Sequence, residues 1–143
     1  MASRNIEIMR RAHQAFNDRD FETNISTLAE QSTYVEHPRG MTISGRDQFR
    51  QFLETWAAAF SNGRITNAQY LDAGDTVIAQ FTFEGVNDGP FGGLPATGRR
   101  VSCPVCEIAR IDENGQAVSA CLYYDQVTIL TQLGHMKPIA AAA

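Results

Sequence analysis

The chain has 143 residues, about the length of one ordinary domain, and a formal net charge of −4. This charge provides no broad basic surface, so we expect neither nucleic acid nor an anionic membrane as a partner. Hydrophobic residues make up 43% of the chain, as in water-soluble globular proteins, and no apolar run is long enough to span a bilayer. Because the charged N-terminus does not resemble a signal peptide, we expect a cytoplasmic protein.

Two amphipathic helices are predicted at the start of the chain. The first runs from Ser3, which can act as its N-cap, to Asp18, and its apolar stripe is Ile6, Met9, His13 and Phe16. A histidine in such a stripe is more often packed and hydrogen-bonded than catalytic. A shorter helix with Phe21, Ile25 and Leu28 on one face is expected to pack against the first.

A short strand is predicted from Thr33 to His37, where Pro38 ends it. Alternation places Val35 and His37 on one face and Tyr34 and Glu36 on the other. We take the face of Val35 as the buried one, which makes His37 a candidate pocket residue. A histidine that only closes the turn before Pro38 fits the pattern equally well.

The next helix is predicted to begin at Ser44, which with Asp47 resembles a capping box, and to end before Gly63. Its apolar stripe is aromatic, and such a stripe usually packs in a core. If a curved sheet wraps around this helix, however, Trp56 and Phe60 would line a cavity.

Two strands from Arg64 to Asp72 and from Thr76 to Val86 are predicted to form a hairpin, with Phe81 on its apolar face. Residues 87–98 are too rich in Gly and Pro for regular structure. This loop carries Phe91 and Leu94, which could cover the mouth of a pocket. It has none of the glycine patterns of a phosphate-binding loop.

A second hairpin is predicted from Arg100 to Tyr124, with Asn114-Gly115 as a two-residue turn. The resulting register places Glu107 opposite Leu122, with Val105 and Tyr124 as neighbours on the same apolar face. A carboxylate there is either the wall of a cavity, with its pKa raised by burial, or a solvated group on an edge strand.

After the last strand, Asp125 is expected to cap a helix that ends at Gly134, and the tail from about Met136 is expected to fray. Cys103-Pro-Val-Cys106 has the spacing of a metal-binding pair. On a strand, however, residues three apart point to opposite faces, so we expect no metal site.

This order of elements predicts one α+β domain over residues 1–143: a cone-shaped, curved antiparallel sheet wrapped around the N-terminal helices, with one internal pocket. The outer face of the sheet is too apolar to remain in water, since it carries Cys106, Ile108, Cys121 and Tyr123. We therefore expect a homodimer or larger homo-oligomer.

Several short motifs resemble the SnoaL-like polyketide cyclases, which belong to the superfamily of nuclear transport factor 2 and ketosteroid isomerase. They are Tyr34 with His37-Pro38, Gly45, Gly85, Gly89 with Phe91-Gly92-Gly93, Pro95 to Arg99, and Asp125 with Gln132-Leu133-Gly134. The resemblance covers nearly the whole chain, and the combination is more specific than any single motif.

The resemblance implies an α+β cone and, in the best-understood members, a cofactor-free aldol ring closure on a polyketide, driven by a carboxylate that acts as general acid and base. By the family pattern the catalytic aspartate lies three positions before the residue that matches Asp125, and this chain has Leu122 there. A pocket position on the preceding strand, a histidine in such cyclases, matches Glu107. The carboxylate of Glu107 would thus take the place of the family's aspartate, from the opposite strand of the hairpin.

Our hypothesis is a cofactor-free cyclase or isomerase that acts on a hydrophobic carbonyl compound. Glu107 would move the proton, and His37 or Tyr124 would stabilise the enolate oxygen. The expected substrate-binding residues are Trp56, Phe60, Phe81, Phe91, Leu94, Val105 and Leu122. The alternatives are a non-catalytic module that binds a hydrophobic small molecule, favoured by Leu122 at the aspartate position, and a scaffold whose cone is filled by its own side chains.

Overall fold

A computed structural model describes residues 3–138, and the end of the tail predicted to fray lies outside these residues. The helices are α1 (Arg4–Asn17), α2 (Phe21–Ser26), α3 (Gly45–Ala59) and α4 (Gln126–Leu133). The strands are β1 (Leu28–Glu36), β2 (Met41–Ser44), β3 (Arg64–Ala73), β4 (Thr76–Val86), β5 (Arg100–Ile111) and β6 (Ala117–Tyr124). The α+β class predicted from the sequence is confirmed.

The strands form one open, six-stranded sheet in the order β2-β1-β6-β5-β4-β3. Neighbouring strands run antiparallel except β1 and β6, which are parallel. The antiparallel pairing expected from the sequence is therefore confirmed at the other strand pairs and does not hold at this one. The long connection from β1 to β6 passes through α3 and other strands of the sheet, so the chain is long enough to return in the parallel direction.

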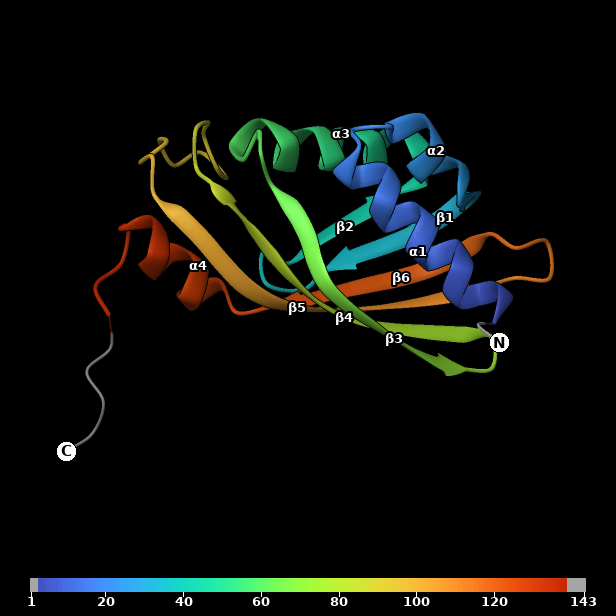
Figure 1. The fold of residues 1–143 in the computed structure, drawn as a ribbon. Helices are drawn as coiled ribbons and strands as arrows, with labels where there is room; N and C mark the ends of the chain where they lie inside the picture. Colours follow the sequence, from blue (N-terminus) through green and yellow to red (C-terminus); the bar gives the residue numbers. More distant parts are fainter. Residues whose placement is uncertain (1–2, 139–143) are drawn as a thin grey trace.

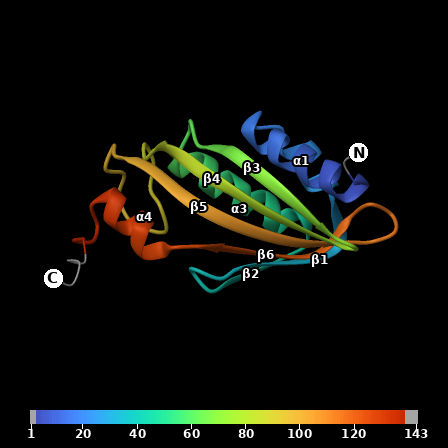
Figure 2. The same cartoon turned by 60° about the horizontal axis from the view of Figure 1, so that its bottom comes forward.

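Strong curvature of the sheet creates the interior, and α1, α2 and α3 lie on its concave side, whereas α4 lies at one end (Figures 1 and 2). Part of this bend comes from β3, whose pairing with β4 shifts register between Thr66 and Gln69. Asn67 there has a φ of 52°, as expected for a bulge that bends a strand. The curved sheet is therefore confirmed, although it does not close into a barrel.

Helix caps fix the ends of the helices largely as the sequence predicts. The side chain of Ser3 accepts a hydrogen bond from the backbone N–H of Ile6, and that of Asp125 accepts one from Val127. Gly134 ends α4 in the left-handed conformation. The capping box at Ser44 is wrong: its side chain caps nothing, and its backbone N–H donates to the side chain of Gln48 instead.

The hairpin of β5 and β6 places Glu107 opposite Leu122, as predicted. The turn itself is longer than the two residues expected, and the register shifts between Arg110 and Ile111. Asp112 accepts hydrogen bonds from the backbone N–H groups of Asn114 and Gln116, while Gly115 takes a φ of 76°. The bulge offsets the longer turn, so the predicted register still holds at Glu107.

The loop of residues 87–98 is held against the end of α3 by a buried asparagine. The side chain of Asn87 donates to the carbonyls of Ala59 and Gly89 and accepts from the backbone N–H of Thr97. Any side chain at Gly89 would collide with the carbonyl of Ala58, 2.0 Å from where a Cβ would lie. Phe91 is buried, 2% exposed, so the loop is packed into the core here.

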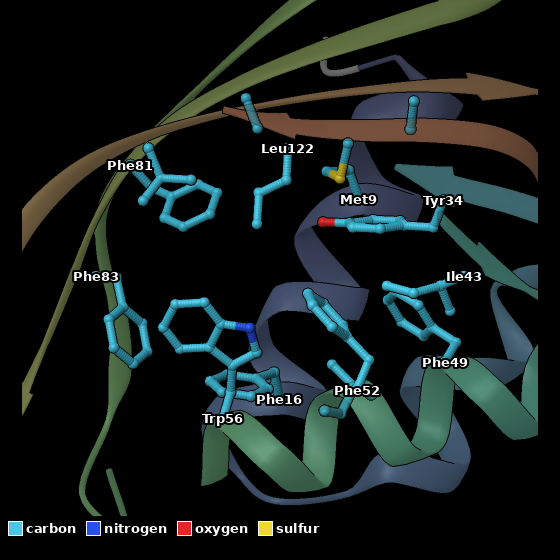
Figure 3. Close-up of a cluster of buried hydrophobic side chains, with 14 of the residues drawn as sticks. Met9, Phe16, Tyr34, Ile43, Phe49, Phe52, Trp56, Phe81, Phe83 and Leu122 are labelled. Carbon is cyan, nitrogen blue, oxygen red and sulfur yellow. The ribbon is translucent and has the colours of Figure 1, made fainter. Parts of the chain in front are cut away.

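An aromatic core fills much of the space between the sheet and α3, where Tyr34, Phe49, Phe52 and Trp56 lie close together (Figure 3). Within residues 3–138, none of the helices is long and apolar enough to cross a membrane.

Candidate functional site

An apolar cavity of about 110 Å³ lies between the concave face of the sheet and the three N-terminal helices. Of the residues that the sequence indicated for the site, its wall includes Trp56, Phe81, Val105, Glu107, Leu122 and Tyr124. The predicted internal pocket therefore exists, and a carboxylate borders it.

Glu107 is the most unusual group in this wall, because its side chain is only 13% exposed. His13 lies with its Nε2 at 2.7 Å from one carboxylate oxygen of Glu107. The hydroxyl of Tyr34 donates a hydrogen bond to the other oxygen. Two side chains from distant parts of the chain, α1 and β1, thus hold the carboxylate in one orientation.

The hydrogen-bonded chain continues from His13 toward the surface. Its Nδ1 lies 2.8 Å from the hydroxyl of Tyr70 on β3. Tyr70 is half-buried, and the guanidinium of Arg10 lies over its ring. Glu107, His13 and Tyr70 therefore form a continuous path of groups that can pass a proton between the cavity and the outside.

Apolar neighbours alone would favour the protonated form of Glu107, but its hydrogen-bond partners favour the ionised form. Burial alone raises the pKa of Glu107, but the hydrogen bond and charge of His13, together with the hydroxyl of Tyr34, outweigh it and lower the pKa below its ordinary value. The raised pKa predicted from sequence is wrong because these two partners were not foreseen. Burial and the charge of Glu107 raise the pKa of Tyr34, which stays protonated as a donor.

The predicted facing of β1 is also wrong. Tyr34 and Glu36 point inward and are buried, whereas His37 is exposed. The ring of His37 stacks on that of Tyr123 on the other side of the sheet, with centroids 4.5 Å apart. His37 therefore does not reach the cavity, and it cannot serve there as the enolate-stabilising donor.

Glu36 forms a second buried carboxylate site next to the cavity. It is fully buried and pairs with Arg39, whose Nη2 lies 2.6 Å from Oε2. The hydroxyl of Tyr124 donates to Glu36 over 2.7 Å. Since the hydrogen of Tyr124 is already engaged, this tyrosine lines the cavity without a free donor, contrary to the role expected for it.

Three of the residues expected to bind substrate pack elsewhere. Phe60 and Phe91 are buried against the ring of Trp56, with centroid distances of 6.1 and 5.2 Å, and neither lines the cavity. Leu94 pairs with Phe91 through two backbone hydrogen bonds of 2.9 Å. The loop of residues 87–98 thus packs against Trp56 through Phe91 and does not cover the mouth of the cavity.

Sequence reasoning missed the partners of both carboxylates. His13 was placed correctly in the buried stripe of α1 and expected to be packed and hydrogen-bonded, but its partners were not named, and Tyr34 was assigned to the outer face. The spacing of Glu36 and Arg39 was the available signal, since residues this close can pair across the turn that follows β1. Nothing in the local sequence points to Tyr70.

The cysteines give no sign of a metal centre. Cys103 is buried, whereas Cys106 is partly exposed on the other face of β5. Among the described residues, no three His, Cys, Asp or Glu side chains come together as metal ligands would.

Comparisons with known proteins agree with this architecture. Solved structures with the same fold include a protein assigned as a SnoaL-like polyketide cyclase from Jannaschia sp. CCS1, at 21% identity and a TM-score of 0.84 over 95% of this chain and 94% of that chain. AclR from Streptomyces galilaeus, assigned as a hydroxylase, is 20% identical, with a TM-score of 0.82 over 95% of this chain and 84% of its own.

A protein of ketosteroid isomerase-like fold from Catenulispora acidiphila, solved in complex with trimethylamine, is 23% identical, with a TM-score of 0.78 over 92% of this chain and 98% of that chain. No curated protein matches the sequence. The family model described as SnoaL-like polyketide cyclase matches residues 6–133. The chain therefore belongs to the SnoaL-like polyketide cyclase family.

Proposed function

We propose that this protein is a cofactor-free general acid/base enzyme, of cyclase or isomerase type, that acts on a small hydrophobic carbonyl compound. The observation that supports this proposal is the position of Glu107, a carboxylate in the wall of an apolar cavity, oriented by two hydrogen-bonding side chains. A base that is held in a fixed orientation beside an apolar cavity is suited to proton abstraction next to a carbonyl.

Glu107 is the proposed base. Its lowered pKa keeps it ionised near neutral pH, and a carboxylate can accept more hydrogen bonds than the two that it makes here. Tyr34 and His13 are positioning residues that fix its two oxygens. His13 also contacts Tyr70, so a proton removed from substrate can leave the cavity along this chain.

Deuterium exchange at the carbon next to the carbonyl of cyclohexanone, followed by NMR in D₂O, tests this role. We expect Glu107→Gln to slow exchange by about 10²- to 10⁴-fold, the usual contribution of a positioned acid/base group. Glu113→Gln makes the same chemical change at an exposed position of the same hairpin and should leave the rate unchanged. Equal exchange rates in the two variants would exclude Glu107 as the base.

A second candidate function is a non-catalytic module that holds a hydrophobic small molecule. Leu122, which stands where the family pattern has its catalytic aspartate, favours it, because this residue lies directly opposite Glu107 and makes the wall more apolar. A ketone that binds without any exchange above the buffer rate would support the binding module and exclude the enzyme.

The outer face of the sheet supports a homodimer or larger assembly. Tyr123 is 45% exposed on this face, and its neighbours there, Cys106, Ile108 and Cys121, are half-buried. We propose that a second copy covers this face. Light scattering should give at least twice the mass of one chain, and Tyr123→Glu should lower it. A monomeric wild-type protein would contradict this assembly.

A further inference from the structure

The indole N–H of Trp56 is a buried donor that has no acceptor among the described residues. Buried tryptophans usually find a partner for this group, and a buried donor that stays unpaired destabilises the fold. Trp56 lies in the wall of the cavity, and Figure 3 shows its nitrogen on the ring edge that faces the centre of the aromatic cluster. A partner for this N–H would therefore have to come from the side of the cavity.

The ring of Trp56 is clamped, so it cannot turn to find a partner within the protein. Phe83 and Tyr124 meet it edge to face, with centroids 5.1 and 5.7 Å away, and Phe91 packs at 5.2 Å. The guanidinium of Arg39 lies 5.3 Å from the ring centre. The packing therefore presents the N–H at a fixed place and direction.

Other polar groups in the cavity wall are already paired. Glu107 is held by His13 and Tyr34, the hydroxyl of Tyr124 donates to Glu36, and the side-chain amide of Asn24 donates to the carbonyl of Ala12. The other unpaired buried side-chain atom in the described residues is Oε1 of Gln126, which does not line the cavity. What the wall still offers a ligand is one N–H donor and one carboxylate.

The size of the cavity restricts the ligand further. A closed apolar cavity of about 150 Å³ is enough to bind benzene in another protein. The cavity found here is smaller, about 110 Å³, so it has room for one small ring or a short chain at most, and not for a fused polycyclic skeleton.

We propose that Trp56 is the polar anchor of this site: its Nε1–H donates a hydrogen bond to the carbonyl oxygen of a one-ring ligand. This inference rests on the proposed function for the same cavity and adds the substrate class and the group that recognises it. The carbonyl takes the place of the missing acceptor, and the apolar ring of the ligand occupies the cavity that Glu107 also borders. A donor fixed before the ligand arrives also stabilises the negative charge that develops on this oxygen during enolisation.

The sequence offers a clean probe, because Trp56 is the one tryptophan of the chain and gives a single indole signal in a ¹H–¹⁵N NMR spectrum. Titration with cyclohexanone should move this indole proton downfield. Cyclohexene, a ring of the same size without an oxygen, is the matched control and should bind without a downfield shift. Trp56→Phe keeps an aromatic ring and should weaken cyclohexanone binding about three- to tenfold, with cyclohexene unaffected.

An indole signal that stays in place while other cavity residues report bound cyclohexanone would overturn the inference. So would equal losses for both ligands in Trp56→Phe, or no binding of cyclohexanone at all. If this variant fails to fold, the titration of the wild-type protein decides alone. The indole shift is measured separately from catalysis. A shift without deuterium exchange would support Trp56 as the hydrogen-bond donor and contradict the proposed enzymatic activity. Exchange without a shift would support the activity and contradict the role of Trp56.

Discussion

Among the described residues, Glu36 and Glu107 both have carboxylates in the interior, but the side chains that pair with them differ, and this difference distinguishes a structural carboxylate from a candidate catalyst. Glu36 is fully buried and faces Arg39 and Tyr124, outside the residues that line the cavity. Glu107 faces His13 and Tyr34 and forms part of the cavity wall. Each carboxylate thus has one cationic or potentially cationic partner and one tyrosine.

The difference lies in the nitrogen partner. Arginine stays protonated at any accessible pH, so the pair of Glu36 and Arg39 cannot exchange a proton and serves to close the end of β1. Histidine can donate a proton through one ring nitrogen and accept one at the other, so His13 can pass a proton between Glu107 and Tyr70. A buried carboxylate is therefore a candidate catalyst because of what it is paired with, and not because it is buried.

The largest effect is expected from Arg39→Met, which leaves Glu36 in the interior without its cation. Removing one partner of a buried pair typically costs about 3–5 kcal/mol of unfolding free energy, which chemical denaturation would measure. Arg50→Met makes the same change at the exposed pair with Glu22 and should cost less than about 1 kcal/mol. Similar losses in the two variants would mean that Glu36 and Arg39 are no more coupled than surface charges.

A somewhat smaller loss, about 2–4 kcal/mol, is expected from His13→Phe, because Tyr34 still donates to Glu107. The sharper readout is the pKa of Glu107. With His13 gone, burial is no longer outweighed, and this pKa should rise above the ordinary value of about 4.3. Carbon-detected NMR can follow the titration, with Glu107→Gln to assign the signal. A pKa that stays low would show that His13 does not set it.

A smaller effect concerns the pH dependence of stability. Because the folded pKa of Glu107 is lowered, its contribution is fully present above the unfolded value of about 4.3 and disappears as the pH falls through the folded pKa. The unfolding free energy of the wild type should therefore fall more steeply below about pH 4.3 than that of Glu107→Gln. Identical slopes would mean that Glu107 has the same pKa in both states.

Local sequence patterns predicted one carboxylate site and missed the other. Turn residues and alternation set the register of the β5–β6 hairpin, so the sequence alone was enough to place Glu107 opposite Leu122. The same reasoning failed on β1, where the pattern from Thr33 to His37 contains a single aliphatic residue, Val35, and gives no reliable buried face. A charged residue, Glu36, is buried there only because Arg39 and Tyr124 satisfy it.

Contacts between distant segments account for the rest of the site. His13, Tyr34 and Tyr70 lie on α1, β1 and β3, and they meet Glu107 or one another only through the curvature of the sheet. Composition and periodicity say which face of an element is apolar, but they do not say which elements a curved sheet brings together. The stripe of α1 showed that His13 is buried and could not show its partner.

The smallest expected change in unfolding free energy comes from removing the hydroxyl of Tyr124, which bonds Glu36, or of Tyr70, which bonds His13. Tyr124→Phe removes a donor from the fully buried Glu36, so we expect a loss of about 1–3 kcal/mol of unfolding free energy. Tyr70→Phe removes the hydroxyl next to His13 at a half-buried position, where water can replace it, and should cost less than about 1 kcal/mol. Deuterium exchange by Tyr70→Phe should nevertheless slow, because a replacing water is not held in a fixed position next to Nδ1 of His13 as the hydroxyl is. Tyr70→Phe could instead lower the unfolding free energy more than Tyr124→Phe and leave the exchange rate unchanged. In that case the hydrogen bonds of Glu107, His13 and Tyr70 only stabilise the fold, as those of Glu36 do, and the two carboxylates do not differ in function.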